Sequence, residues 1–337
     1  MTLTRKPSRH RTPGSGPTMA DLAELAGVSA ITVSRALANS PLVNAETAAR
    51  VKAIAEAQGY AFNVSARNLR LRSNRTVAVI VEMKPSQDRR MSDPYPLDLL
   101  GGISQELASA GYCVLLSTRQ GGDAAAVRGA DAVILLGQGA HEDAVETVAR
   151  WHLPMVVWGA QVPHDAHVTV GSDNRRGGAL AAERFVALGR HRIAFLGDIA
   201  HAEVAARLAG FETVLAAHKL KVSQAKPAAF TVAAGAKATH TLLERQPQID
   251  ALFAASDLLA IGAVRALTER GRRVPDDVSV IGYDDTPLGA TYVPALSSVH
   301  QNLHEGGVLL ARKALALIEG REVESEILPT NLVVRAT

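Results

Sequence analysis

Short apolar runs that alternate with helical stretches dominate the chain from Thr76 onward. A first set reads VAVIV, YCVLLS, DAVILLG and MVVWG, and a second set reads RIAFLGD, AAFTV, ALFAAS and VSVIGYDD. Such runs are typical of parallel strands buried on both faces, and the helical stretches between them indicate an α/β architecture. We therefore expect two Rossmann-like lobes that face each other across a cleft, with the ligand site beyond the carboxyl ends of the strands.

The stretch from Met19 to Asn39 predicts two short helices joined by a tight turn. Thr18 and Asp21 have the spacing of a helix N-terminal cap, and Gly27 suits a left-handed turn before a second cap at Ser29. The first helix has an inward apolar stripe of Leu22, Leu25 and Ala26. Helix, glycine turn and helix are the outline of a helix-turn-helix motif.

The second of these helices has an inward side and an outward side. Val33 and Leu37 are spaced to face inward, which leaves the outer face to Ala30, Ile31, Ser34 and Arg35. Small residues followed by an arginine suit a helix that enters the major groove of DNA, because bulk would block approach while arginine binds guanine and phosphate. The pattern alone is also compatible with an ordinary pair of antiparallel helices in a helical domain.

A third helix completes a small DNA-binding domain over residues 18–62. It begins at the cap Asn44 and ends at Gly59, and its inward stripe is Ala48, Val51, Ile54 and Ala55. Residues 1–17 mix proline, glycine, serine and basic residues without periodicity, which predicts a disordered basic arm.

The basic charge of the chain is concentrated at its N-terminal end. Residues 1–75 hold 11 Lys and Arg against 4 Asp and Glu, a net charge of +7, and the remainder holds 25 against 29, a net charge of −4. One end therefore favours a polyanion. No apolar run is long enough to cross a membrane and no signal peptide is apparent, so we expect a cytoplasmic protein. The single cysteine, Cys113, is expected to be a buried small hydrophobe.

The segment from Val28 to Arg70 resembles the DNA-binding headpiece of the lactose-repressor (LacI/GalR) family of bacterial transcription regulators. The matching elements are AGVS, TVSRAL, the N-x-E-T start of the third helix, the GY that ends it, and N-x-x-A-R-x-L. The resemblance continues through VGSDNRRGG, RIAFLG, ARLAGF, SDLLAIGAVRAL, RVPDDVSVIGYDD and the terminal LVVR. It implies a helix-turn-helix headpiece, a periplasmic-binding-protein-like core of two lobes, and a homodimer that binds double-stranded operator DNA.

The same resemblance implies a hinge helix in residues 63–75, where Leu69 would wedge between bases of the minor groove and kink the duplex. An ordinary linker hydrophobe is the alternative for Leu69. The residues expected to contact DNA are Thr18, Ser29, Ala30, Ile31, Ser34, Arg35, Asn63, Arg67, Leu69 and Arg70.

The resemblance also divides residues 76–337 between the two lobes. The chain is expected to cross near Gly171, Gln301 and Gly320, so that the first lobe comprises about 76–171 and 302–319 and the second about 172–300 and 320–337. One departure from the family is the short segment TRQGGDAAAVRG between two strands of the first lobe. A crossover there has room only for a minimal helix.

Several polar and aromatic residues at strand ends are candidates for the effector site. Asp284 follows a buried strand and Arg207 opens a helical stretch, and together they could bind the hydroxyl groups of a sugar. The two could instead simply pair with each other. The resemblance adds Tyr95, His201 and Phe230, and Trp158 could stack on a sugar ring or belong to the hydrophobic core. Where the family often has an acid after Trp158, this chain has Gly159.

No enzyme motif accompanies these features. The chain lacks a P-loop, a strand-to-helix G-x-G-x-x-G and a nucleophile elbow, and the pair His164 and His167 lacks a third metal ligand. We expect no catalysis, no cofactor and no metal. The expected function is a transcription repressor of carbohydrate-utilisation genes that a sugar-type effector releases from a palindromic operator. A co-repressor-dependent regulator and, less compatibly, a solute-binding protein are the alternatives.

Overall fold

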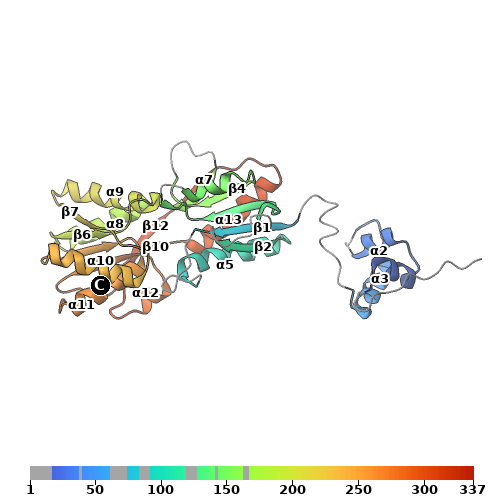
Figure 1. Cartoon of the computed structure of the whole chain (residues 1–337), viewed down its shortest axis with the longest axis horizontal. Coiled ribbons are helices and arrows are strands. Elements are labelled where there is room, and N and C mark those ends of the chain that lie inside the picture. The colour runs from blue at the N-terminus through green and yellow to red at the C-terminus, as the bar shows by residue number, and fades with distance from the viewer. Residues whose placement is uncertain are drawn as a thin grey trace, which may run out of the picture. The chain divides into compact units, whose positions relative to one another are not determined.

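The computed structural model describes residues 17–37, 40–60, 74–82, 92–118, 127–140, 143–161 and 167–337. The chain forms two compact units, Met1–Arg72 and Ser73–Thr337, and each is described by itself (Figure 1). In the described part of the chain, no helix is both long enough and apolar enough to cross a lipid bilayer.

The described residues of the first unit, which we call the headpiece, form three helices around one small core. The helices are α1 (Met19–Ala26), α2 (Ala30–Leu37) and α3 (Ala45–Ala57). The predicted caps are confirmed: Thr18 and Asp21 form a reciprocal capping box, Gly27 has φ 66°, and the Asn44 side chain accepts from the Thr47 amide at 2.8 Å. These caps satisfy backbone groups that a helix end leaves unpaired.

The core of the headpiece differs in one position from the predicted stripe. Leu22, Ala23 and Ala26 of α1 are buried, but Leu25 is 56% exposed. The reason is the tight packing of three short helices, which lets Ala23 take the inward position beside Leu22. Val33 of α2 is buried as predicted, and the remaining buried members are Ala36, Val51 and Ala55.

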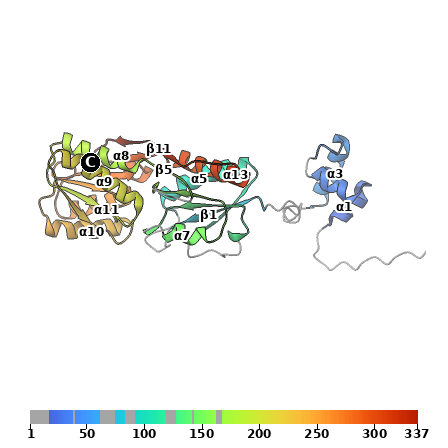
Figure 2. The same cartoon turned by 90° about the horizontal axis from the view of Figure 1, so that it is seen from above.

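The second unit consists of two α/β lobes, each built on one sheet (Figure 2). Among the described residues, the first lobe has a parallel sheet in the order β11-β5-β4-β3-β1-β2. Its strands are β1 (Thr76–Val81), β2 (Cys113–Thr118), β3 (Ala132–Leu136), β4 (Met155–Trp158), β5 (Val168–Ser172) and β11 (Glu326–Leu328). The described helices of this lobe include α5 (Pro94–Ser109), α7 (Asp143–Ala149) and α13 (Leu303–Ile318).

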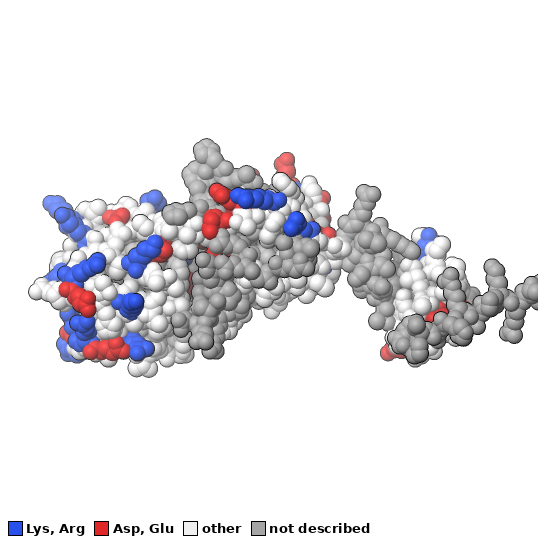
Figure 3. Space-filling view, in the orientation of Figure 1, with Lys and Arg blue, Asp and Glu red and all other residues white. Residues whose placement is uncertain are grey.

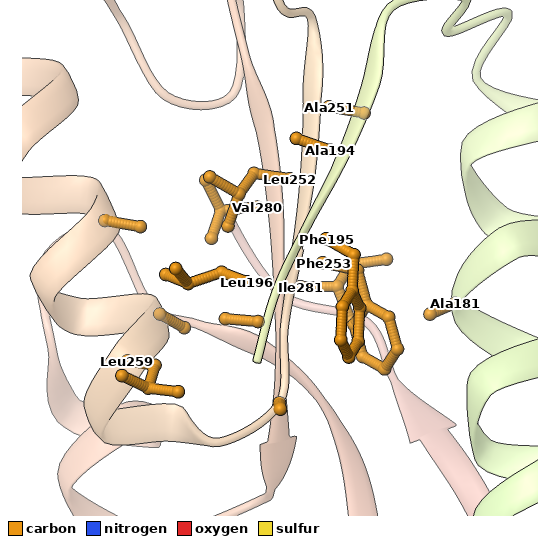
Figure 4. Close-up of a cluster of buried hydrophobic side chains, with 14 of the residues drawn as sticks. Ala181, Ala194, Phe195, Leu196, Ala251, Leu252, Phe253, Leu259, Val280 and Ile281 are labelled. Atoms are coloured by element: carbon orange, nitrogen blue, oxygen red, sulfur yellow. The ribbon is translucent and has the colours of Figure 1, made fainter. Parts of the chain in front are cut away.

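The second lobe has a sheet in the order β12-β10-β9-β8-β6-β7, parallel except for β12 within the described residues. Its strands are β6 (Ile193–Leu196), β7 (Val222–Ala225), β8 (Ala251–Ala254), β9 (Ser279–Asp284), β10 (Ser297–Gln301) and β12 (Thr330–Val333). Its helices are α8 (Asn174–Ala187), α9 (Ala202–Ala217), α10 (Val232–Arg245), α11 (Asp257–Glu269) and α12 (Pro287–Thr291). Aromatic residues fill one side of this sheet, with Phe195 and Phe253 at 5.5 Å between ring centroids (Figure 4).

The chain passes between the lobes three times. It leaves the first sheet after Ser172, returns after Gln301, and leaves again between Leu328 and Thr330. The last crossing was predicted near Gly320, and that position is wrong. The reason is β11, which follows Gly320 and still pairs with β5 of the first lobe.

Two further sequence predictions need correction. The run AAFTV is not a strand, because Thr231 within it caps α10 through the Ala234 amide, and the edge strand β7 lies earlier at Val222–Ala225. Cys113 is exposed instead of buried, because β2 is the edge strand of its sheet and stays partly exposed along its length. Most of the short segment after β2 lies outside the described residues.

Helices α8 and α9 approach each other through two glycines. A Cβ atom at Gly178 would overlap the backbone oxygen of Arg207, and one at Gly210 would overlap that of Arg175. Any larger residue at either position would therefore push the helices apart. This close contact brings Asn174 of α8 next to Arg207 of α9, where the two side chains are hydrogen-bonded.

Candidate functional site

The outer face of α2 is the candidate DNA-reading surface. Ala30 and Arg35 are exposed, Ser34 is partly buried, and Ile31 is 63% exposed even though it is a large hydrophobic residue. These residues therefore project from the headpiece on the side away from Val33 and Ala36, as the sequence predicted. The face is open, and its single arginine stands in the last turn of the helix.

Two of the predicted DNA contacts have local roles as well. The Thr18 hydroxyl is hydrogen-bonded to the Asp21 carboxylate at 2.9 Å, and the Ser29 hydroxyl accepts from the Thr32 amide at 3.2 Å. Both residues therefore stand at helix N-termini, where free backbone amides favour phosphate. Asn63, Arg67, Leu69 and Arg70 lie outside the described residues.

Charge is distributed differently on the two-lobe unit. Lys and Arg are interspersed with Asp and Glu on the visible face of the second lobe (Figure 3). Ion pairs of this lobe include Arg273 with Asp277 at 3.0 Å and Arg265 with Glu269 at 2.8 Å. This face therefore lacks the one-sided basic character of the N-terminal 75 residues.

A pocket lined by residues of both lobes lies between them. It opens at the carboxyl ends of β1, β3, β8 and β9, where ligands of this fold class bind. The lining residues are Val81, Glu82, Asp93, Tyr95, Pro96, Leu136, Gly137, Gln138, Gly139, His201, Glu203, Val204, Arg207, Phe230, Ala255, Ser256, Leu258, Asp284 and Thr286. Five of the six predicted effector residues are among them.

Arg207 is held rigidly at the second lobe's side of the pocket. Its Nε donates to the Asn174 carboxamide at 2.8 Å, and its Nη1 donates to the Ala255 carbonyl at 2.5 Å. The guanidinium also lies 3.6 Å above the ring centroid of Tyr283. These contacts fix the plane of the guanidinium while leaving its other Nη2 edge available for a ligand.

Asp284 ends β9 in an unusual backbone conformation, with φ 105°. The Gln301 amide donates to its Oδ1 at 2.6 Å. Burial raises the pKa of the Asp284 carboxyl well above its usual value, against the opposing effect of Arg207. Asp284 and Arg207, both described, form no ion pair with each other, so the alternative of simple mutual pairing is not what the structure shows. A strained residue held this way is common at ligand sites.

The predicted aromatic residues divide into two groups. Tyr95, His201 and Phe230 line the pocket, and the rings of His201 and Phe230 meet edge to face at 5.3 Å between centroids. Burial raises the pKa of the Tyr95 hydroxyl, which keeps it a hydrogen-bond donor. Trp158 is only 2% exposed and lies in the hydrophobic core of the first lobe, outside the pocket lining.

The side chain of Gln138 leaves no space for a side chain at Gly159, the residue that follows Trp158. Its amide donates to the Ala160 carbonyl at 2.9 Å, and its carbonyl accepts from the Ala160 amide at 2.8 Å. A Cβ atom at Gly159 would lie 2.5 Å from the Gln138 side chain. Gln138 therefore occupies the space that a side chain at position 159 would need, and it supplies a polar wall to the pocket.

Gln138 and Glu203 also line the pocket, and neither was predicted from the sequence. Glu203 stands four positions before Arg207 on α9, so the two share a helix face and both reach the pocket. That spacing was the available signal for Glu203. Gln138 carried no comparable signal, because its position depends on how the loop after β3 packs on the end of β4.

Asp257 connects α11 to the loop after β9 and to β10, next to the second lobe's side of the pocket. Its carboxylate accepts from the Thr286 amide at 2.6 Å, the Thr286 hydroxyl at 2.9 Å and the Ser298 hydroxyl at 2.6 Å. Burial raises the pKa of Asp257 to about 6, although these hydrogen bonds oppose that shift. The network holds the loop after Asp284 against α11.

Comparisons with known proteins relate both regions to one family. Residues 18–63 match the bacterial regulatory proteins of the lacI family, and residues 182–337 match the periplasmic binding protein-like domain. The HTH-type transcriptional regulator CelR of Thermobifida fusca is 33% identical over 95% of this chain and 97% of its own. The HTH-type transcriptional regulator AscG of Escherichia coli (strain K12) is 33% identical over 84% of this chain and 86% of its own.

Solved structures show the same arrangement. A transcriptional regulator CelR–cellobiose complex has a TM-score of 0.70 at 32% identity and covers 95% of this chain and 99% of its own. The lac repressor dimer bound to operator and the anti-inducer ONPF has a TM-score of 0.84 at 26% identity, covering 96% and 99%. The chain therefore belongs to the lacI family of bacterial regulatory proteins, and it is a transcription regulator that binds DNA through its helix-turn-helix headpiece.

Proposed function

We propose that the protein is a cytoplasmic, homodimeric repressor that a sugar-type effector releases from a palindromic operator. Residues 18–62 bind the operator, residues 63–75 form the hinge, and residues 76–337 bind the effector and dimerise. Ala30, Ile31 and Arg35 read bases, Ser29 and Ser34 hold phosphates, and Leu69 bends the duplex. No chemical step is assigned to the pocket.

The observation that carries this proposal is the separate anchoring of Arg207 and Asp284 on one wall of the pocket. Arg207 is hydrogen-bonded to Asn174 and Ala255, and Asp284 is hydrogen-bonded to Gln301. The guanidinium and the carboxyl group therefore do not form an ion pair with each other. A guanidinium and a carboxylate presented together can each bind neighbouring hydroxyl groups of one ligand. The cellobiose complex of CelR and a ribose complex of a LacI-family regulator from Enterococcus faecium support a sugar as the ligand class.

The pocket also has the right position for control. Its lining comes from both lobes, and the chain crosses between them three times, so a ligand bound there favours one angle between the lobes. The free energy available for switching is the difference in ligand affinity between the two lobe arrangements. Such coupling is typically about 1–3 kcal/mol, or roughly 5–150-fold in operator affinity.

The test begins with a binding-site selection that provides the operator sequence. Fluorescence anisotropy of the labelled operator is then measured with the full-length protein in the presence of cellobiose, ribose and a panel of other mono- and disaccharides. A thermal-shift assay on the same panel reports binding, because a ligand that binds only the folded state raises the melting temperature. We expect one sugar to raise the melting temperature and to release the operator. Tighter operator binding instead would establish a co-repressor, and no response to any sugar would contradict the sugar class.

A further inference from the structure

Glu203 places a second carboxyl group on the same wall of the pocket as Asp284. It is the second residue of α9 and lines the pocket one helical turn before Arg207. It forms no ion pair with a Lys or Arg of the described residues, and the charges that oppose its own are those of Arg207 and His201. Glu203 is therefore a titratable group at the pocket without an ion-pair partner among the described residues.

The surroundings of Glu203 are acidic. Asp284 lies on β9, and Glu82 and Asp93 line the first lobe's side, where each has interactions of its own. The opposing groups are Arg207 and His201 on α9 itself. Burial is the main cause that raises the pKa of both Glu203 and Asp284, and Glu82 raises that of Glu203 further. Adding more negative charge to this pocket is unfavourable.

Arg207 offsets only part of this negative charge. Two of its donor positions already bind Asn174 and Ala255, and its face covers Tyr283. An arginine that recognises a carboxylate or phosphate usually presents two parallel N–H groups to it. Here Nε and Nη1 each already donate one hydrogen bond, so a ligand carboxylate would meet the remaining Nη2 edge of the guanidinium beside two carboxyl groups.

A neutral sugar meets no such penalty. Its hydroxyl groups donate to carboxylate oxygens, and each ionised carboxylate has acceptor positions for more than one of them. A sugar acid has the same hydroxyl groups but adds a charge that faces Glu203 and Asp284, and juxtaposed like charges are a common means of rejecting a wrong ligand.

We propose that Glu203 makes this pocket selective against acidic effectors, so that the effector is an uncharged sugar and not a sugar acid or a sugar phosphate. The proposal rests on the proposed function, because it specifies the ligand of that same site. It assigns Glu203 as a specificity-determining residue that acts by charge.

The test uses matched pairs that differ only in a carboxylate: glucose with glucuronate, galactose with galacturonate, and cellobiose with cellobionate. Isothermal titration calorimetry measures Kd for each compound on the full-length protein, on Glu203→Gln and on Glu212→Gln. Glu212 is an exposed residue of the same helix, so its variant removes an equal charge outside the pocket. At least one neutral sugar is expected to bind the unmodified protein. For that pair, we expect the Kd of the acid to be at least ~10-fold higher than the Kd of the neutral sugar.

Glu203→Gln removes the carboxylate while keeping the shape of the side chain. We therefore expect it to reduce the ratio of the two Kd values, which we call the gap, about fivefold or more. Glu212→Gln should leave this ratio unchanged. A second measurement needs no variant. Lowering the pH protonates Glu203, whose pKa is raised, while the ligand carboxylate stays ionised, so the gap for the unmodified protein narrows as the pH falls. In Glu203→Gln this narrowing is smaller.

Three outcomes overturn the proposal. An acid that binds the unmodified protein as tightly as its neutral partner overturns it while leaving a sugar-type effector intact. A gap that is the same in Glu203→Gln and constant with pH shows that Glu203 does not set the selectivity. If no compound binds either protein, and none does in the wider sugar panel, the sugar class of the proposed function fails and this proposal fails with it.

Discussion

In the headpiece, the residues assigned to base reading lie on the exposed face of one helix, α2, within six positions of one another. In the two-lobe unit, the pocket brings together side chains from positions as distant as Tyr95 and Asp284, and Arg207 and Asp284 are only 6% and 8% exposed. The headpiece meets a large polyanion that arrives from solvent, so its groups must project. The pocket surrounds a small ligand, so its groups must be buried and held in place. The two regions therefore respond to different perturbations.

Salt is expected to separate the two regions most strongly. Operator affinity depends on Lys and Arg that displace counterions from DNA, and a protein that neutralises about 6–10 phosphates loses roughly 10³–10⁵-fold in affinity between 50 and 200 mM salt. Sugar binding in the pocket releases no such counterions and is expected to change little. Anisotropy and calorimetry over the same salt series measure both. A flat plot of log K against log salt for the operator would mean that the basic N-terminal end has another role.

Replacing Arg35 by alanine is expected to give the next largest effect. A lost arginine–base contact costs about 1–3 kcal/mol in each half-site and relaxes the preference for one base pair. Arg50→Ala, at an exposed position on α3 of the same headpiece, is the matched control. Binding-site selection with both variants measures the change. An unchanged consensus with full affinity for Arg35→Ala would remove this arginine from the reading surface.

Arg207→Ala and Asp284→Ala are expected to abolish most of the effect of the effector on operator affinity without altering the headpiece. Both variants still bind the operator, but each loses most of an effector response of about 5–150-fold. Arg176→Ala, which removes an exposed arginine of α8 that pairs with Glu183, should retain the response. Operator anisotropy against ligand concentration is the measurement. A normal response in both pocket variants at the usual ligand concentration would place the effector site elsewhere.

The smallest expected effect belongs to the surface of the second lobe. Arg273 donates to Asp277 and lowers the pKa of that partly exposed carboxyl to about 2. A lowered folded-state pKa means that the ionised group stabilises the fold above about pH 4, and that this contribution is lost as the pH falls toward 2. The difference in urea midpoint between the unmodified protein and Asp277→Asn is therefore expected to be small near pH 6 and to shrink at pH 3. Asp276→Asn, whose residue lies 3.4 Å from the same guanidinium, is the control. A difference that is constant with pH would contradict the pairing.

Much of the fold could be predicted from the sequence, because local signals mark its elements. The capping box of Thr18 and Asp21, the turn at Gly27 and the apolar runs of β1, β3 and β9 depend mainly on neighbouring residues. The errors occurred where the surroundings decide. AAFTV has the composition of a strand but includes a helix cap, and Cys113 lies in an apolar run that forms an exposed edge strand.

The site divides in the same way. The sequence by itself determined the helix-turn-helix, the two lobes and the position of Asp284 at the end of an apolar strand, because periodicity and caps are properties of nearby residues. It predicted that Arg207 opens a helix, whereas Arg207 lies inside α9, which begins at Ala202. Only the tertiary structure decided that Trp158 is core, that Gln138 fills the space above Gly159, that β11 returns to the first lobe, and that Glu203 and Asp284 line the same pocket. Each of these depends on the packing of segments that are distant in the chain. A short stretch of sequence does not specify which distant segments it will contact.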